Sequence, residues 1–207
     1  MTTTFRTHDT FVFDQIVQER KRKGIDLYDE VWDGVYVMPS MPSLEHQELV
    51  HDLDTLFDDV VIVPGLGKCY PGVNVSDRAS GWKKNFRVPD VAIVLKDSRA
   101  IRHKNHIQGG PDFLVEIESP GNDIEEKVPF YGKIGVSELL IIHRDKRSLR
   151  LLRLQGEELV LVKPSLLEGK EWLLSEVLPL SFRRTVSKGV PRTQVRRTDG
   201  QAGQWTI

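Results

Sequence analysis

The sequence predicts an α/β or α+β domain whose central β-sheet is mixed. Helical patterns alternate along the chain with short apolar runs that are rich in β-branched residues. Residues 113–142 have the strand–helix–strand order of a right-handed crossover, which places two strands in parallel. A hairpin follows, and it adds antiparallel strands to the parallel pair.

Two amphipathic helices are expected in the first half of the chain. Apolar residues recur at helical spacing over residues 9–23, where Asp9 or Thr10 can cap the start and Gly24 can end the helix. Ser43 caps the second helix, which runs to about residue 57. Its inward stripe is His46, Val50, Leu53 and Phe57.

The expected strands are short and are separated by turn residues. The run DEVWDGVYVMP alternates as a single strand near a sheet edge does, and Pro39 ends it. Further strands are expected at 60–63, 73–75, 88–95 and 113–117. After these come a helix over about 124–133, a buried strand at 139–142, and a hairpin of 149–154 with 158–163.

Length and charge predict one domain followed by a basic tail. A chain of 207 residues suits a single domain, which is expected to cover residues 1–182. Residues 183–207 hold six basic residues and one acidic residue, although the whole chain has a net charge of −1. This tail is expected to be a flexible terminus or, alternatively, a basic arm that holds phosphates.

The composition also bears on the cellular setting. No run approaches 18 apolar residues, and the first residues lack the charged and apolar regions of a signal peptide. A single cysteine, Cys69, excludes an internal disulfide and a multi-cysteine zinc site. A cytoplasmic protein without a membrane span is therefore expected.

Two carboxylates lie inside apolar strands, where a charge is costly unless it has a partner or a metal. Asp90 lies in RVPDVAIVL and Glu116 in PDFLVEIESP. If the two strands pair, these side chains can face each other about 5 Å apart. A divalent cation would remove their repulsion, and oxygen ligands, including the backbone carbonyl of Ile117, favour Mg²⁺ or Mn²⁺.

Lys127 follows the second strand and completes a set able to cut a phosphodiester. Its ammonium group would stabilise charge on a phosphate or act on the attacking water. Each residue also has a purely structural explanation: a loop cap for Asp90, a salt bridge for Glu116, and a solvated helix position for Lys127.

At these residues the chain resembles the Uma-two family of bacterial restriction-endonuclease-like proteins, within the PD-(D/E)xK nuclease superfamily. The resemblance covers about residues 26–182 and rests on the order and spacing of DEVWDGVYVMPSMPSLEHQELVHDL, RVPDVAIV, PDFLVEIESPGNDIEEKVPFYGKIGVSELLII and LSEVLPLSF. It implies a restriction-endonuclease-like core with helices flanking a mixed sheet, and a metal-dependent nuclease site in which Asp90 and Glu116 are the acids. Glu118 stands where the superfamily usually has lysine, and Lys127 matches a lysine moved to the next helix.

The resemblance also implies accessory residues. Tyr131 matches the family and shares a helix face with Lys127. His46 either contacts a phosphate or the metal's surroundings, or is a satisfied core residue. Asp33 either supports the site or makes a structural hydrogen bond. Glu118 either adds a metal ligand or simply ends its strand.

Two further groups of residues outside this set could bind a ligand. Lys83, Lys84 and Arg87 are candidate contacts to nucleic acid beside aromatic residues, with a loop anchor as the alternative. His103 and His106 are spaced by three, but the surrounding polarity favours an exposed loop over a zinc site.

The function expected from these features is a Mg²⁺-dependent endonuclease that acts on DNA, with RNA as an alternative substrate. A DNA-binding or regulatory module that keeps the nuclease fold without efficient cleavage is the alternative. A third class is a metal-dependent hydrolase of another phosphoester. Duplex cleavage needs two sites, so a homodimer is expected on symmetry grounds.

Overall fold

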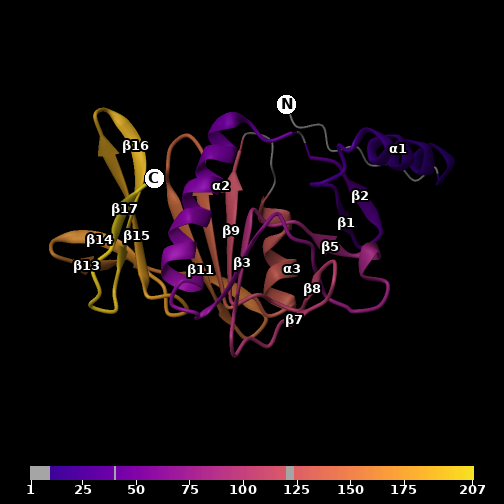
Figure 1. The fold of residues 1–207 in the computed structure, drawn as a ribbon. Helices are drawn as coiled ribbons and strands as arrows, with labels where there is room; N and C mark the ends of the chain where they lie inside the picture. Colours follow the sequence, from indigo (N-terminus) through magenta and orange to yellow (C-terminus); the bar gives the residue numbers. More distant parts are fainter. Residues whose placement is uncertain (1–9, 40, 120–123) are drawn as a thin grey trace.

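A six-stranded mixed sheet forms the centre of the molecule (Figure 1). The computed structural model describes residues 10–39, 41–119 and 124–207. The strand order is β12-β11-β10-β9-β6-β3, in which β9 and β10 are parallel and the other neighbours are antiparallel. This confirms the predicted mixed sheet. Its strands are β3 (Gly67–Pro71), β6 (Val91–Leu95), β9 (Phe113–Glu118), β10 (Glu138–His143), β11 (Leu149–Gln155) and β12 (Glu158–Leu161).

The crossover between β9 and β10 is short. From residue 124 on, it contains the 3₁₀ turn η3 (Ile124–Glu126) and the α-helix α3 (Val128–Lys133). Pro129 lies in the first turn of α3, where its missing amide leaves no helical hydrogen bond unmade. Alternate residues of each strand face opposite sides of the sheet, so α2 (Leu44–Phe57) and α3 cover its two faces.

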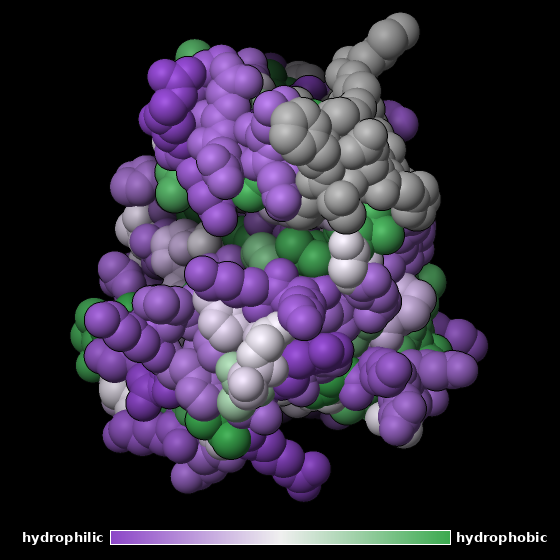
Figure 2. Space-filling model, turned by 90° about the vertical axis from the view of Figure 1, so that its right-hand side faces the viewer, coloured by the Kyte–Doolittle hydropathy of each residue, from purple (hydrophilic) through white to green (hydrophobic). Residues whose placement is uncertain are grey.

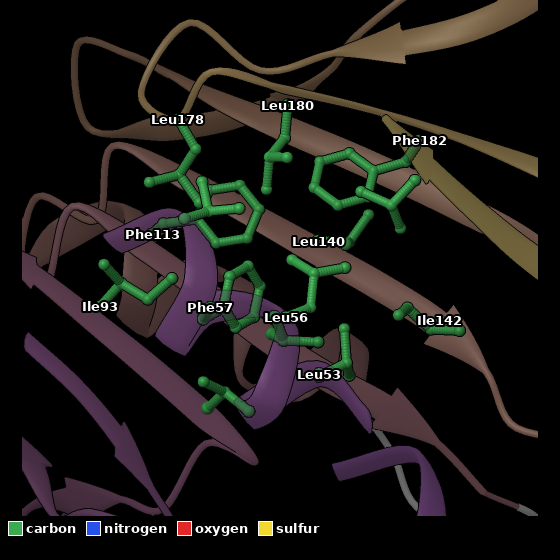
Figure 3. Close-up of a cluster of buried hydrophobic side chains, with 14 of the residues drawn as sticks. Leu53, Leu56, Phe57, Ile93, Phe113, Leu140, Ile142, Leu178, Leu180 and Phe182 are labelled. Carbon is green, nitrogen blue, oxygen red and sulfur yellow. The ribbon is translucent and has the colours of Figure 1, made fainter. Parts of the chain in front are cut away.

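The main core lies between α2 and the central sheet (Figure 3). Ser43 caps α2 by accepting a hydrogen bond from the backbone amide of His46, as the sequence predicts. Leu53, Leu56 and Phe57 of α2 then pack on the sheet, with Phe57 edge-to-face on Phe113 at 6.1 Å between ring centroids. The second cluster, on the α3 side, includes Leu114 and the fully buried Tyr131.

A second sheet with the order β2-β1-β5-β4-β8-β7 lies beside the first. The predicted single strand over DEVWDGVYVMP is wrong: the segment is a hairpin of β1 (Glu30–Trp32) and β2 (Val35–Val37). Asp33 and Gly34 form its turn with φ of 48° and 88°, a conformation that Asp-Gly adopts readily. The other strands are β4 (Val75–Ser76), β5 (Phe86–Arg87), β7 (Ile101–Arg102) and β8 (Ile107–Gln108).

Three local expectations are corrected by the structure. Residues 60–63 are not a strand, because the helix continues past Phe57 as the π-helical turn η1 (Asp58–Ile62), which buries Val60 and Val61. β3 was not expected at all. The expected strand at 73–75 is shifted to β4. The first helix, α1 (Thr10–Lys23), ends at Gly24 as predicted, and its candidate cap Asp9 lies outside the described residues.

The flexible basic tail expected from residue 183 is also wrong. Residues beyond 164 form a third sheet of β13 (Ser165–Leu167), β14 (Lys170–Leu174), β15 (Leu180–Ser187), β16 (Val190–Arg197) and β17 (Gln204–Thr206). Phe182 and Val195 are fully buried in the main core, which offsets the entropy of ordering the chain. Arg183 and Arg196 are the neighbours of these two residues and so lie on the opposite face of the hairpin, where both stack on Trp172.

The side of the molecule that carries α1 and the β1–β2 hairpin is largely hydrophilic (Figure 2). A narrow band of hydrophobic residues crosses this surface. The last turn of α1 adds four basic residues, Arg20 to Lys23. Among the described residues, no helix is long and apolar enough to span a membrane.

Candidate active site

Asp90 and Glu116 lie opposite each other, where β6 begins and β9 approaches its end. The antiparallel pairing of Val91 with Val115 fixes this register. Asp90 accepts a hydrogen bond from the backbone amide of Ile117, with 2.6 Å between the nitrogen and Oδ2. The amide and carbonyl of one strand residue point to the same edge, so the Ile117 carbonyl is also directed toward Asp90. The structure therefore places Asp90 at the edge of β9 beside Ile117, directly across from Glu116 in the register of the two strands.

Two side chains from the crossover segment hold Glu116, whose exposed fraction is 1%. The Nζ atom of Lys127 lies 3.1 Å from Oε1 and 3.2 Å from Oε2 of Glu116. The Tyr131 hydroxyl donates to Oε1 at 2.6 Å. Lys127 is the residue that precedes α3, and Tyr131 follows one turn later, which places both on the face that covers β9.

A third buried carboxylate, Glu30 of β1, belongs to the same arrangement and was missed in the sequence. Its Oε1 lies 2.9 Å from Nζ of Lys127. Glu30 also accepts hydrogen bonds from the Val88 amide at 2.7 Å and the Trp32 indole at 2.5 Å. Lys127 thus bridges two carboxylates that come from different sheets. The sequence feature that points to Glu30 is an acidic residue at the start of a short apolar strand, which an Asp-Gly turn follows.

The buried charges shift one another's pKa values. Burial raises the pKa of Glu116 to about 7; Lys127 opposes this rise, whereas Asp90 and Glu30 add to it. Burial alone would lower the pKa of Lys127, but the carboxylates of Glu116 and Glu30 raise it above its ordinary value. Burial also raises the pKa of Tyr131, so its hydroxyl remains a donor. At neutral pH Lys127 is therefore a fixed cation, and Glu116 is the group that titrates.

Glu116 is expected to make the stability of the metal-free protein depend on pH. Between pH 4.5, its ordinary pKa, and about 7, the folded chain binds more protons at this carboxyl than the unfolded chain does. The free energy of unfolding therefore falls as the pH rises through this window. Relative to Glu116→Gln, the fall is expected to be about 2–3 kcal/mol, because each unit of pKa shift corresponds to about 1.4 kcal/mol.

Urea unfolding of the wild type and Glu116→Gln in EDTA, followed across this pH window, measures the effect. Glu118→Gln, the same change two residues along β9 at a half-exposed position, serves as the control and should parallel the wild type. Parallel curves for the wild type and Glu116→Gln would show that Glu116 is not the titrating group.

His46 lies in the first turn of α2, and its side chain is directed at Asp90. Its Nε2 is 2.8 Å from Asp90 Oδ1, and its Nδ1 is 3.4 Å from the hydroxyl of Ser119. The cap of α2 fixes the helix start at Ser43, so the backbone holds the imidazole in place. His46 is therefore a partner of Asp90 and not a residue of the apolar core between helix and sheet.

Two of the other accessory candidates lie apart from this cluster. Asp33 is exposed in the β1–β2 turn, where its backbone amide donates to the Asn85 side chain at 3.0 Å. It is thus a turn residue. Glu118 shares the face of Glu116 but lies at the half-exposed end of β9, and its described ion pair is with Arg150 at 3.9 Å.

Arg87 does not form part of an exposed nucleic-acid surface, so this prediction is corrected. Only 3% of the residue is exposed. Its guanidinium group lies over the rings of Trp32 at 4.9 Å and Phe130 at 4.2 Å, and it donates to the Val31 carbonyl at 3.0 Å. Arg87 therefore joins β5 to β1 and α3. Lys83 and Lys84 are exposed in η2 (Trp82–Lys84), and their contact with nucleic acid stays a prediction.

The two loop histidines flank the tip of the β7–β8 hairpin. Their rings stack at 4.5 Å, and the His106 ring also stacks on Trp82 at 4.8 Å. His106 is buried and its Nε2 lies 3.2 Å from the Arg78 carbonyl, which differs from the exposed loop that was expected for it. The pair anchors the hairpin to the loop that contains Trp82.

The donors around Asp90 and Glu116 suit a hard cation with few protein ligands. Within the described residues, no three His, Cys, Asp or Glu side chains are grouped so that together they could hold a metal ion. Mg²⁺ requires less, since it is commonly bound by one or two carboxylates, with waters and substrate phosphates as its other ligands. Asp90, Glu116 and the Ile117 carbonyl are the oxygen donors that could form such a partial set, although both oxygens of Glu116 already contact Lys127.

The comparison with known families bears directly on this site. The profile of the Uma2 family, described as "Putative restriction endonuclease", matches residues 24–187, well over half of the chain. The chain belongs to the Uma2 family. The matched range of this Uma2 protein contains Glu30, His46, Asp90, Glu116 and Lys127. This confirms the family that the sequence resembles.

A solved structure is similar to this Uma2 protein as well. It is a "putative nuclease belonging to DUF820" from Anabaena variabilis, with a TM-score of 0.53 and 20% sequence identity. The match covers 64% of this chain and 75% of that chain. At this identity the likeness shows the fold, which agrees with the predicted nuclease-like core. A comparison with curated proteins found no match.

Proposed function

We propose that this Uma2 protein is a metal-dependent endonuclease that hydrolyses DNA phosphodiester bonds. The observation that carries the proposal is that Asp90, Glu116 and Lys127 gather around the end of β9. The Ile117 amide donates a hydrogen bond to Asp90 with 2.6 Å between nitrogen and oxygen, and Nζ of Lys127 lies 3.1 Å from Oε1 of Glu116. Two facing carboxylates with an adjacent ammonium group suit a divalent cation and an anionic substrate. The family description supports the same activity.

The residues that would hold Mg²⁺ or Mn²⁺ are Asp90, Glu116 and, through its backbone carbonyl, Ile117. When bound, such a cation supplies a water of lowered pKa and stabilises charge on the phosphate. His46 and the Ile117 amide each hold one oxygen of Asp90, so they orient the carboxylate. Tyr131 orients Glu116 in the same way.

Lys127 supplies a fixed positive charge beside Glu116. Its raised pKa keeps the ammonium protonated, so it acts by electrostatic attraction to the phosphate and not as a general base. Glu30 is a positioning residue, because it holds Nζ of Lys127 at 2.9 Å from the side opposite Glu116. Water is the nucleophile in this scheme, because the described side-chain partners of Asp90 and Glu116 are His46, Lys127 and Tyr131, and none of these is a serine or cysteine.

One observation favours the alternative of a binding or regulatory module. Lys127 is 6% exposed, and two of its donors already point at Glu30 and Glu116. A phosphate must therefore displace one of these contacts in order to reach the ammonium group. If that displacement does not occur, the fold would bind nucleic acid without cutting it.

Cleavage assays separate the two functions. Supercoiled plasmid, linear duplex, single-stranded DNA and RNA are incubated with the purified chain in EDTA, Mg²⁺ or Mn²⁺. Cleavage that requires the metal and is lost in Asp90→Asn is the expected result. Nucleic-acid binding without metal-dependent cleavage would favour the binding module. Cleavage in EDTA, or cleavage that Asp90→Asn retains, would contradict the proposed site.

Cutting both strands of a duplex requires two active sites. A two-fold symmetric homodimer would supply them, because each copy would face one strand. Sedimentation of the chain with and without duplex DNA measures the oligomeric state, and a dimer in the presence of duplex is the expected result.

A further inference from the structure

A cavity of about 220 Å³ opens beside the candidate active site. His46, Gln47 and Asp90 are its polar lining residues, so the cavity reaches a predicted metal ligand. Apolar side chains and an aromatic ring complete the lining: Leu27, Tyr28, Val50 and Pro71, together with Gly72. Leu27 is 74% exposed, so a large apolar side chain is accessible to solvent beside these polar residues.

A second cavity, of about 340 Å³, adjoins the first. Pro71 and Gly72 line both, so the two cavities lie on either side of these residues at the end of β3. Gly72 has a φ of 59°, a left-handed conformation that glycine adopts readily, and its amide donates to the Asp90 carbonyl at 3.1 Å. The junction of the two cavities is therefore tied to the backbone of the candidate active site.

The second cavity has a positive character. No acidic residue is among its lining residues, whereas Arg102 and Lys104 of the β7–β8 hairpin are both present and exposed. The Arg102 guanidinium group donates to the Tyr70 hydroxyl at 3.2 Å, which places a cation beside an aromatic ring. The stack of His103, His106 and Trp82 anchors the hairpin, so these cations are presented from a fixed position.

Cations combined with aromatic rings along one groove are the features with which proteins bind single strands. The cations track the phosphates, and the rings stack on bases. The first cavity is smaller than the roughly 300–1,000 Å³ that is typical of drug-sized ligands, so it suits one planar base. A base can enter only if it is unpaired, because a base within a duplex is stacked and paired.

We propose that the two cavities form the path of one nucleic-acid strand, with phosphates at Arg102 and Lys104 and an unpaired base beside Tyr28, next to Asp90. This inference rests on the proposed function for the identity of the ligand, and it deepens that function by naming the substrate class. It assigns the binding surface to the β7–β8 hairpin and not to the third sheet, where the tail's basic residues lie. The substrate implied by this path is a nucleic acid with an unpaired nucleotide at the cleavage site.

Binding of fluorescently labelled oligonucleotides in EDTA tests the strand path without any need for cleavage. The double variant Arg102→Ala/Lys104→Ala is expected to bind single-stranded DNA at least tenfold more weakly at about 0.1 M salt. Its slope of log affinity against log salt should be shallower by about 1.4, since each lost phosphate contact on a single strand contributes about 0.7. Tyr28→Ala is expected to weaken single-strand binding about fivefold or more while changing duplex binding little.

The matched control is Lys170→Ala/Lys188→Ala, which removes two exposed lysines from the third sheet and should leave affinity and slope unchanged. Circular dichroism melts of each variant check that it is folded. Wild-type affinity and slope in the Arg102→Ala/Lys104→Ala variant would overturn the strand path while leaving the proposed function intact. Equal weakening of single-strand and duplex binding by Tyr28→Ala would overturn the unpaired base. Absence of both binding and cleavage in the wild type would defeat the proposed function as well.

Discussion

Asp90→Asn is expected to abolish metal-dependent cleavage while leaving the fold in place. Asparagine has nearly the same shape as aspartate, so its carbonyl oxygen can still accept the 2.6 Å hydrogen bond from the Ile117 amide. The substitution removes the negative charge of Asp90, which is one of the two charges that would attract the cation. We expect the cleavage rate to fall on the order of 10³-fold or more, a loss comparable to removing one preorganised electrostatic group from an active site.

Calorimetric titration with Mg²⁺ or Mn²⁺ should show that the variant has lost its metal binding, while its urea midpoint changes little. Asp33→Asn is a matched control, because it makes the same chemical change on the exposed β1–β2 turn, at a backbone conformation that asparagine tolerates. It should cleave and bind metal like the wild type. If Asp90→Asn retains normal metal binding, the cation lies elsewhere and the proposed site is wrong.

The facing of Asp90 and Glu116 could be anticipated because it depends on local rules. Strand periodicity placed each carboxylate on a defined face, and pairing of the two strands set them opposite each other. The crossover rule then placed Lys127 directly after the second strand, on the segment that covers it. These steps need only short-range patterns and the standard geometry of one strand–helix–strand unit.

Glu30 could not be found in this way, because its partner Lys127 is 97 residues away in the chain and lies on another sheet. The failure also had a local cause. The alternation of apolar residues through Asp33-Gly34 predicts one strand, although Asp-Gly between apolar residues is a strong hairpin signal. The correct hairpin would have left Glu30 at the start of a buried strand, where an acid needs a partner.

The third sheet and the burial of Arg87 likewise depend on contacts between segments that are distant in the chain. Lys188-Gly189, with φ of 50° and 78°, turns β15 into β16, so the basic tail is a hairpin whose alternate residues Phe182 and Val195 are buried. Arg87 looked like an exposed cation in the sequence. Aromatic rings and backbone carbonyls from distant segments instead surround it, and these contacts become visible only in the folded chain.

Lys127→Met is expected to destabilise the protein by about 3–5 kcal/mol, the cost of removing one partner from a buried ion pair. Lys127 lies between Glu30 and Glu116, at 2.9 Å and 3.1 Å, and all three residues are nearly inaccessible to water. Methionine fills similar space but leaves two carboxylates buried without their shared cation. The loss is therefore electrostatic, and urea unfolding in EDTA at neutral pH measures it.

A triple variant distinguishes this cause from poor packing. Adding Glu30→Gln and Glu116→Gln to Lys127→Met removes both uncompensated charges while keeping hydrogen-bonding groups for Val88, Trp32 and Tyr131. Most of the lost stability should return, because the cost of breaking a buried ion pair exceeds that of replacing it whole. Lys133→Met, an exposed lysine on the same helix, should change stability by less than about 0.5 kcal/mol. If the triple variant is no more stable than Lys127→Met, the destabilisation comes from packing and not from the three charges that surround the candidate site.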